Sequence, residues 1–288
     1  MALRDALRRK YHTFLDNEDR ARAGSAVEAY PMLNTLMVDV LDEDALIQER
    51  YLWGVIQAAY LATSLGVDRI SLLEFGVGRG DGLVLLERAA QLVGRRLEVD
   101  LDVVGFDIGT GVPEPEDPRD VPNMFVPDLF RMDVDATHAR LDRAQLAVGD
   151  VGVTVPRFLT RSPSPVGFAA FDFGSYTGTL AALAVLDAPT ELLLPRVYCY
   201  FANILGFTYG DCVGERLAIT EYNARTASRQ ISPIFGLHHY VPRRFRNASW
   251  PDRYHLAHIF DHPAYATHDR FLRHTPESYQ AQTFTSRT

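Results

Sequence analysis

Short apolar runs alternate with stretches of helical periodicity after residue 65, and this alternation constrains the fold of the chain more than any other feature. Five runs have the length and the branched or aromatic residues of buried strands: 70–75, 101–106, 145–148, 166–171 and 192–201. Helical periodicity is found over 82–92, 177–186 and 215–225. Because parallel strands need crossover connections, which are usually helices, this order predicts an α/β fold with a three-layer, doubly wound and mostly parallel sheet.

The remaining segments predict how the chain is organised around that sheet. Residues 1–65 have helical periodicity, so we expect a helical extension before the first strand. A proline- and acid-rich loop at 112–118 begins an insertion, 108–144, which we expect to lie over the carboxyl edge of the sheet and to contain one short helix. Two or three further short strands are expected over 226–288, among them 230–237 and 254–260. We divide the chain into an N-terminal helical segment (1–65), a Rossmann-like domain (66–275) and a polar tail (276–288).

Charge and composition exclude several kinds of partner. The formal net charge of −8 repels polyanions, so we expect no nucleic-acid partner. No run of about 18 apolar residues is present, so we expect no membrane span. The N-terminus lacks the apolar core of a signal peptide, and the two cysteines, Cys199 and Cys212, are too few for a disulfide framework. We therefore expect a cytoplasmic protein.

A glycine-rich loop directly after the first strand is the strongest local signal. Residues 72–82 read LLEFGVGRGDG, with glycines spaced G-x-G-x-G and the carboxylate of Glu74 just before the end of the strand. A dinucleotide fold has G-x-G-x-x-G and places a pyrophosphate at the helix N-terminus, where a carboxylate would repel it. S-adenosylmethionine carries an ammonium and a sulfonium and no phosphate, so Glu74 favours this cofactor. The alternative is a glycine turn that serves only close helix–strand packing.

Carboxylates also follow the next two strands. Asp107 ends the second strand, where an acid can accept hydrogen bonds from both ribose hydroxyls of a nucleoside. Asp150 follows the third strand and can face the adenine amino group at the same edge. A helix or turn cap is an equally reasonable role for Asp150.

On these residues the sequence resembles the class I S-adenosylmethionine-dependent methyltransferases, and within them the macrocin-type sugar O-methyltransferases. The matching stretches are 73–80, 104–113, 148–151 with 154–156, and 170–176. The resemblance implies a fold of the class I methyltransferase type, with residues 66–275 as the methyltransferase domain and S-adenosyl-L-methionine as cofactor. It also implies the residues that hold the cofactor. Glu74, Gly76, Gly78 and Gly80 would line the methionine end, Asp107 the ribose and Asp150 the adenine.

The acceptor side needs a group that removes a proton from a hydroxyl. Asp172 ends the fourth strand and Tyr176 follows at the start of a helix, so both are candidates for catalysis. The macrocin-type pattern implies a divalent cation held by a second acid after Asp172 and by an acidic pair after the fifth strand. Here Gly174 replaces the second acid and Ala202-Asn203 replace the pair. We therefore predict no metal site.

Histidines are a second source of a base, because seven of the nine lie near the C-terminus: His238, His239, His255, His258, His262, His268 and His274. We expect a strand at 254–260, which would point His255 and His258 to opposite faces and argues against a metal site there. His262, in an Asp-His-Pro turn, is the histidine that we select as a candidate base.

We therefore expect an S-adenosylmethionine-dependent methyltransferase that acts on a small-molecule acceptor, at a hydroxyl oxygen and without a metal. Two alternatives remain open. One is an NAD(P)-dependent oxidoreductase, and the other is a catalytically silent protein that binds the cofactor and serves as a partner. The sequence leaves open whether the chain forms a homo-oligomer.

Overall fold

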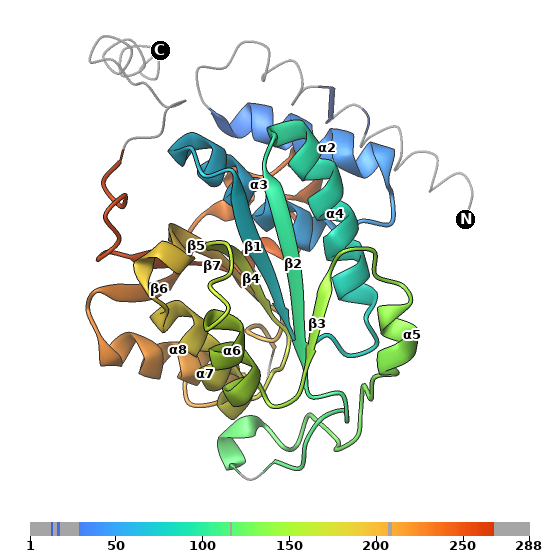
Figure 1. Cartoon of the computed structure of the whole chain (residues 1–288), viewed down its shortest axis with the longest axis vertical. Helices are drawn as coiled ribbons and strands as arrows, with labels where there is room; N and C mark the ends of the chain where they lie inside the picture. Colours follow the sequence, from blue (N-terminus) through green and yellow to red (C-terminus); the bar gives the residue numbers. More distant parts are fainter. Residues whose placement is uncertain (1–12, 14–15, 18–28, 116, 207–208, 268–288) are drawn as a thin grey trace.

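The computed structural model describes residues 13, 16–17, 29–115, 117–206 and 209–267 (Figure 1). The expected polar tail, 276–288, and nearly all of the first 28 residues lie outside this part. The statements that follow concern the described residues.

A seven-stranded sheet with the order β3-β2-β1-β4-β5-β7-β6 forms the centre of the molecule (Figure 1). The first five strands are parallel, and β7 runs antiparallel to both β5 and β6. The strands are β1 (Arg69–Phe75), β2 (Asp100–Asp107), β3 (Gln145–Val148), β4 (Val166–Phe171), β5 (Leu193–Phe201), β6 (Arg229–Pro233) and β7 (Tyr254–Ile259). All seven predicted strands are therefore confirmed, within a few residues of their expected ends.

Helices cover both faces of the sheet, so the predicted three-layer α/β fold is confirmed. Helices α3 (Glu49–Leu65) and α4 (Asp81–Leu97) pack on one face, and α2 (Ala29–Glu43) packs on them. The opposite face carries α6 (Val151–Leu159), α7 (Tyr176–Leu183) and α8 (Gly214–Arg225). Each face has its own apolar core, because alternate residues of a strand point to opposite sides.

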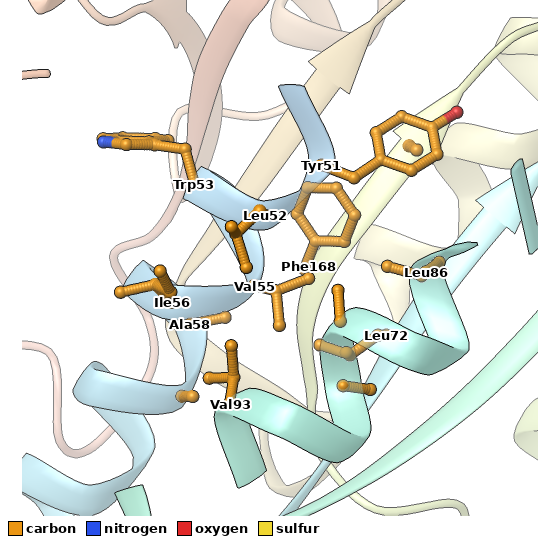
Figure 2. Close-up of a cluster of buried hydrophobic side chains, with 14 of the residues drawn as sticks. Tyr51, Leu52, Trp53, Val55, Ile56, Ala58, Leu72, Leu86, Val93 and Phe168 are labelled. Atoms are coloured by element: carbon orange, nitrogen blue, oxygen red, sulfur yellow. The ribbon is translucent and has the colours of Figure 1, made fainter. Parts of the chain in front are cut away.

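Helix α3 belongs to the central core, although it precedes the first strand. Figure 2 shows its side chains, among them Val55 and Ile56, packed with Leu72 of β1 and Phe168 of β4. At Gly54 any side chain would overlap the ring of Phe168, so the glycine lets the helix approach the sheet closely. A helix that is apolar nearly all round is typical of a buried position. The N-terminal helical segment thus supplies part of one layer of the fold.

Two features between the strands differ in how well the sequence predicted them. The insertion contains the expected short helix, α5 (Val134–His138). Helix α6 was not among the expected helices; it is short and has Pro156 inside it. Proline cannot donate a backbone hydrogen bond, so the helix lacks one bond at this position. In the structure, Asp150 caps the N-terminus of α6 and accepts a hydrogen bond from the backbone N–H of Gly152 at 2.7 Å.

Candidate functional site

The candidate residues gather at the carboxyl edge, the edge at which the parallel strands end. From β1 the chain proceeds to β2 and β3 on one side and to β4 and β5 on the other, so the winding reverses between β1 and β4. The backbone N–H of Asp172, just after β4, donates to the carbonyl of Phe75 at the end of β1 (2.8 Å). Ligands of doubly wound sheets bind outside the strand ends at such a reversal.

The glycine loop links β1 to α4 at this edge. Gly76, Gly78 and Gly80 all have positive φ angles, +86°, +54° and +86°. At Gly76 a Cβ atom would lie 2.6 Å from the carbonyl oxygen of Asp172. Only glycine combines this backbone conformation with such a close approach. The loop therefore brings backbone groups of β1 and β4 together without a side chain between them.

Asp107 joins the end of β2 to the glycine loop. One carboxylate oxygen accepts from the N–H of Gly78 at 2.8 Å, and the other accepts from the N–H of Gly109 at 2.6 Å. The residue is 9% exposed. Each carboxylate oxygen can accept a second hydrogen bond. Asp107 is thus held in a fixed orientation and keeps acceptor capacity for a ligand hydroxyl.

Glu74 lies behind the loop, between the first turns of α3 and α4. Its Oε1 accepts a hydrogen bond from the hydroxyl of Tyr51 at 3.0 Å, and its Oε2 is buried with no partner among the described residues. A side chain at position 82 would overlap the Glu74 carboxyl group, so Gly82 makes room for it in the first turn of α4. Glu74 is 2% exposed and does not lie on the open surface of the loop.

Burial raises the pKa of Glu74 to about 8, and the hydrogen bond from Tyr51 offsets part of this effect. The group is therefore neutral at pH 7 in the free protein. A cation bound nearby would favour the ionised form. Tyr51 was not singled out from the sequence, because its helix is separated from β1 along the chain and only packing brings them together.

Asp172 is exposed to solvent and lies close to several charged groups. Its pKa is raised mainly by desolvation, and the effect is offset by the nearby guanidinium of Arg50, by a hydrogen bond from Asn203 and by the guanidinium of Arg253. Nδ2 of Asn203 donates to Oδ1 of Asp172 at 3.2 Å. A solvent-accessible carboxylate with a raised pKa and a fixed orientation is suited to accept a proton from a bound acceptor.

A second buried acid, Glu215, supports this arrangement from the first turn of α8. Its Oε2 accepts from the backbone N–H of Asn203 at 3.0 Å, while its Oε1 has no partner among the described residues. The pKa of Glu215 is raised well above its ordinary value by burial and by the charge of Asp172. The sequence did not indicate this role, because an acid in the first turn of a helix is common.

The insertion extends across the carboxyl edge, as predicted. Its stem is anchored by Asp120, whose carboxylate accepts from the backbone N–H of Thr177 at 2.7 Å and from its hydroxyl. Further along, Cβ of Phe130 would lie 3.6 Å from a Cβ at Gly78. The ring of Phe125 occupies the space that a side chain at Gly174 would need. An aromatic ring thus stands where the macrocin-type pattern has its second acid.

Tyr176 is at the carboxyl edge but turns toward α8. Its hydroxyl donates to Oε2 of Glu221 at 2.6 Å, and the guanidinium of Arg119 lies 4.2 Å from the centre of its ring. The side chain is 6% exposed and belongs to the core between the sheet and α7. These contacts hold the phenol away from Asp172 and suit a structural role.

The structure does not bring His262 to the site, and our expectation of a base there is corrected. Because β7 is antiparallel to β5, the turn after Ile259 lies near the start of β5, at the edge opposite to Asp172. Partial burial lowers the pKa of His262, and a hydrogen bond with the backbone of Leu193, the first residue of β5, offsets part of this effect. Its Nδ1 accepts from the N–H of Ala264 at 2.9 Å, which stabilises the turn.

Asp150 is exposed at the end of β3, on the expected edge. One of its oxygens is engaged in the α6 cap, which realises the capping role considered from the sequence. The other oxygen has no recorded partner in the described part of the chain and remains accessible. Capping and contact with an adenine amino group are compatible for a carboxylate with two oxygens.

The described residues contain neither a cluster of metal ligands nor a membrane-spanning helix. No group of three or more His, Cys, Asp or Glu side chains is placed to hold a metal ion. No helix among those residues is long and apolar enough to span a bilayer. A surface hollow of about 770 Å³ lies between α4 and the start of β2 and has none of the candidate residues in its lining.

Comparison with known proteins gives matches only among solved structures. No protein-family model matches the chain, and no curated protein matches it. The O-methyltransferase NovP is similar over 62% of this chain and 72% of its own, with 18% identity and a TM-score of 0.47. The calicheamicin methyltransferase CalS11 is similar over 78% of this chain and 88% of its own, with 21% identity and a TM-score of 0.44. The plantazolicin methyltransferase BpumL, in complex with a monoazolic desmethylPZN analogue and SAH, is similar over 88% of this chain and 98% of its own, with 10% identity and a TM-score of 0.33. All three are described as methyltransferases.

Proposed function

We propose that this chain is an S-adenosylmethionine-dependent methyltransferase that methylates a hydroxyl oxygen of a small molecule. The observation that carries the proposal is the pair of acids around the glycine loop. Asp107 is fixed by the loop itself, and Glu74 is buried behind it with one oxygen unpartnered. A nucleoside with a cationic amino-acid tail matches this pair, because a nearby ammonium group would favour the ionised form of Glu74, whereas a pyrophosphate would oppose it.

The residues of the loop fit such a cofactor. Asp107 has acceptor capacity left for the ribose hydroxyls, and Asp150 has an accessible oxygen at the adenine end. Gly76, Gly78 and Gly80 allow the tail to approach the backbone. Glu74 acts as a buried counter-charge that ionises when the ammonium group is bound. When bound, S-adenosylmethionine would supply a methyl group on a sulfonium, from which a neutral thioether is a good leaving group.

Asp172 is the base in this proposal. The acceptor oxygen attacks the methyl carbon as the carbon–sulfur bond breaks, and Asp172 takes the hydroxyl proton, so that the products are a methyl ether and S-adenosylhomocysteine. Asn203 orients Asp172 by its hydrogen bond, and Glu215 holds Asn203 in turn. Tyr176 and His262 are left out of the reaction, because the structure engages the first with Glu221 and puts the second at the opposite edge.

No divalent cation is needed in this account. Asp172 is a single carboxylate, and the nearest amide, Asn203, turns its donor Nδ2 toward it. A hard cation requires several oxygen ligands. We propose a metal-independent enzyme that functions in the cytoplasm on a small-molecule substrate.

The test is a transfer assay with radiolabelled S-adenosylmethionine and a panel of hydroxylated small molecules. We expect radiolabel in a product that is stable in mild base, as an ether is, together with release of S-adenosylhomocysteine. Label that is lost in mild base would indicate an ester, and binding of the cofactor without transfer to any acceptor would favour the silent partner. Binding of NAD in place of S-adenosylmethionine would favour an oxidoreductase.

A further inference from the structure

Two half-buried arginines near Asp172 have no carboxylate partner among the residues that the structure describes. Arg50 lies in the first turn of α3, and Arg253 ends the short helix Pro251–Arg253 just before β7. In the described part of the chain, neither guanidinium has a recorded hydrogen bond or ion pair, and Nε of Arg50 is buried without a partner. Arg229 and Arg244, which are similarly buried, each bind a carboxylate at 3.0 Å. Burying a guanidinium without a counter-ion is costly, so an unpaired pair calls for an explanation.

Aromatic packing fixes the positions of the two arginines. Each is followed by a tyrosine, Tyr51 or Tyr254, and both rings pack edge-on against Tyr200 of β5, with centroids 5.6 and 5.3 Å apart. The hydroxyl of Tyr254 also donates to the backbone carbonyl of Arg50. Because Tyr200 pairs with Ala170, two residues before Asp172, the arginines flank the carboxyl edge at Asp172.

The charges at this position do not balance. Arg50 and Arg253 both lower the pKa of Asp172 and that of Tyr200, so both guanidiniums lie close to these groups. Burial raises the pKa of Glu74 to about 8 and that of Glu215 well above its ordinary value, so burial favours the neutral form of both acids. The two guanidiniums therefore lie beside Asp172, while burial disfavours the negative charge of the two other acids nearby, in a chain whose net charge is −8.

We propose that the acceptor carries an anionic group, a carboxylate or a phosphate ester, which Arg50 and Arg253 bind while the reacting hydroxyl lies beside Asp172. The planar fork of a guanidinium matches both oxyanions in geometry. The inference rests on the proposed function, because it assigns the substrate class of the same site. It also gives the two arginines a counter-ion that the described residues do not supply.

The experiment measures binding to protein saturated with S-adenosylhomocysteine, by isothermal titration. Three probes share a hydroxylated ring and differ in charge: glucose 6-phosphate, glucuronate and methyl glucoside. The variants are Arg50→Gln, Arg253→Gln and the matched control Arg157→Gln, which changes an exposed arginine of α6 that is far from the site in the fold. Thermal unfolding of each variant verifies that it is folded.

We expect one of the two anionic probes to bind and the neutral probe to bind at least tenfold more weakly. Arg50→Gln and Arg253→Gln should each lower the affinity for the anionic probe about tenfold or more, as loss of a charge-assisted hydrogen bond does. Arg157→Gln should leave this affinity unchanged. Comparison of the affinities for glucose 6-phosphate and glucuronate identifies which anionic group the site binds. The inference would be overturned if all three probes bound with equal affinity, or if the anionic probes bound to all variants with equal affinity. Either result would leave the methyltransferase proposal intact. Failure of S-adenosylhomocysteine itself to bind would instead count against the proposed function.

Discussion

The hydroxyl of Tyr51 donates a hydrogen bond to the buried carboxyl group of Glu74 across 3.0 Å, and so joins the start of α3 to the end of β1. Tyr51→Phe removes this donor and leaves both oxygens of Glu74 without a partner. We expect the free energy of unfolding to fall by about 1–3 kcal/mol, the usual cost of leaving a buried polar group unpaired. Urea denaturation at pH 7 measures the change. In a Glu74→Leu background the same substitution should cost less, and an equal cost in both backgrounds would show that the bond contributes nothing.

Binding of the cofactor should depend on pH through Glu74. Burial raises its pKa to about 8 in the free protein, so below that pH the group is protonated. The ammonium of S-adenosylhomocysteine favours the ionised form, and binding therefore releases a proton. Affinity should rise between pH 6 and pH 8, by up to about tenfold per pH unit, and then level off.

Titration calorimetry in buffers of different ionisation enthalpy counts the released proton. Glu74→Gln removes the titrating group, so its affinity should be nearly independent of pH over the same interval. A pH dependence that persists unchanged in Glu74→Gln would assign the proton to another group.

Asp172→Asn should strongly reduce turnover without weakening cofactor binding. The substitution keeps the shape of the side chain and removes the base, so we expect kcat to fall by about 10²- to 10⁴-fold. The affinity for S-adenosylhomocysteine should stay within about twofold. Asp100→Asn, at the exposed start of β2, is the matched control and should retain full activity. Turnover at the wild-type rate in Asp172→Asn would show that a group other than Asp172 accepts the hydroxyl proton.

Phe125 should make Gly174 intolerant of a side chain. Gly174 has φ +70°, and an added Cβ would overlap the ring of Phe125. We expect Gly174→Ala to lower the free energy of unfolding by about 1–3 kcal/mol through backbone strain and overpacking. In a Phe125→Ala background the strain and a close contact with Asn203 remain but the overlap with the ring is gone, so the cost should be smaller. Chemical denaturation of the four proteins measures the difference, and equal costs would contradict the contact.

The same arrangement predicts that methyl transfer is insensitive to metal removal. The macrocin-type pattern that the sequence resembles has several acids for a cation, and of these only Asp172 is present in this sequence, since Gly174 and Asn203 take the places of others. Turnover should therefore be unchanged after dialysis against EDTA and after addition of Mg²⁺. A loss with EDTA that Mg²⁺ restores would place a cation in the reaction.

The sequence predicted the layers and the edge of the site because both depend on local pattern. Buried strands and amphipathic helices have a visible period, and an acid at the end of a parallel strand must lie at the carboxyl edge. The positions of Glu74, Asp107 and Asp172 in the sheet therefore agree with expectation. Their roles in binding and catalysis remain predictions.

Other parts of the site could not be predicted, because they depend on packing between distant segments. Helical periodicity says that α3 has a buried face but not that Tyr51 meets Glu74. The prediction for His262 was wrong because the direction of the last strands was not known, and an antiparallel β7 carries the turn to the opposite edge. Arg253 and Glu215 lie in segments whose sequence gives no sign that they converge on Asp172.

The most direct test of the account is titration of the purified chain with S-adenosylhomocysteine and with NAD, by calorimetry at pH 8. We predict that S-adenosylhomocysteine binds once per chain and that NAD does not bind. Asp107→Ala should lower the affinity for S-adenosylhomocysteine by about tenfold or more, since two hydrogen bonds to the ribose are lost. Binding of NAD without binding of S-adenosylhomocysteine would contradict the account.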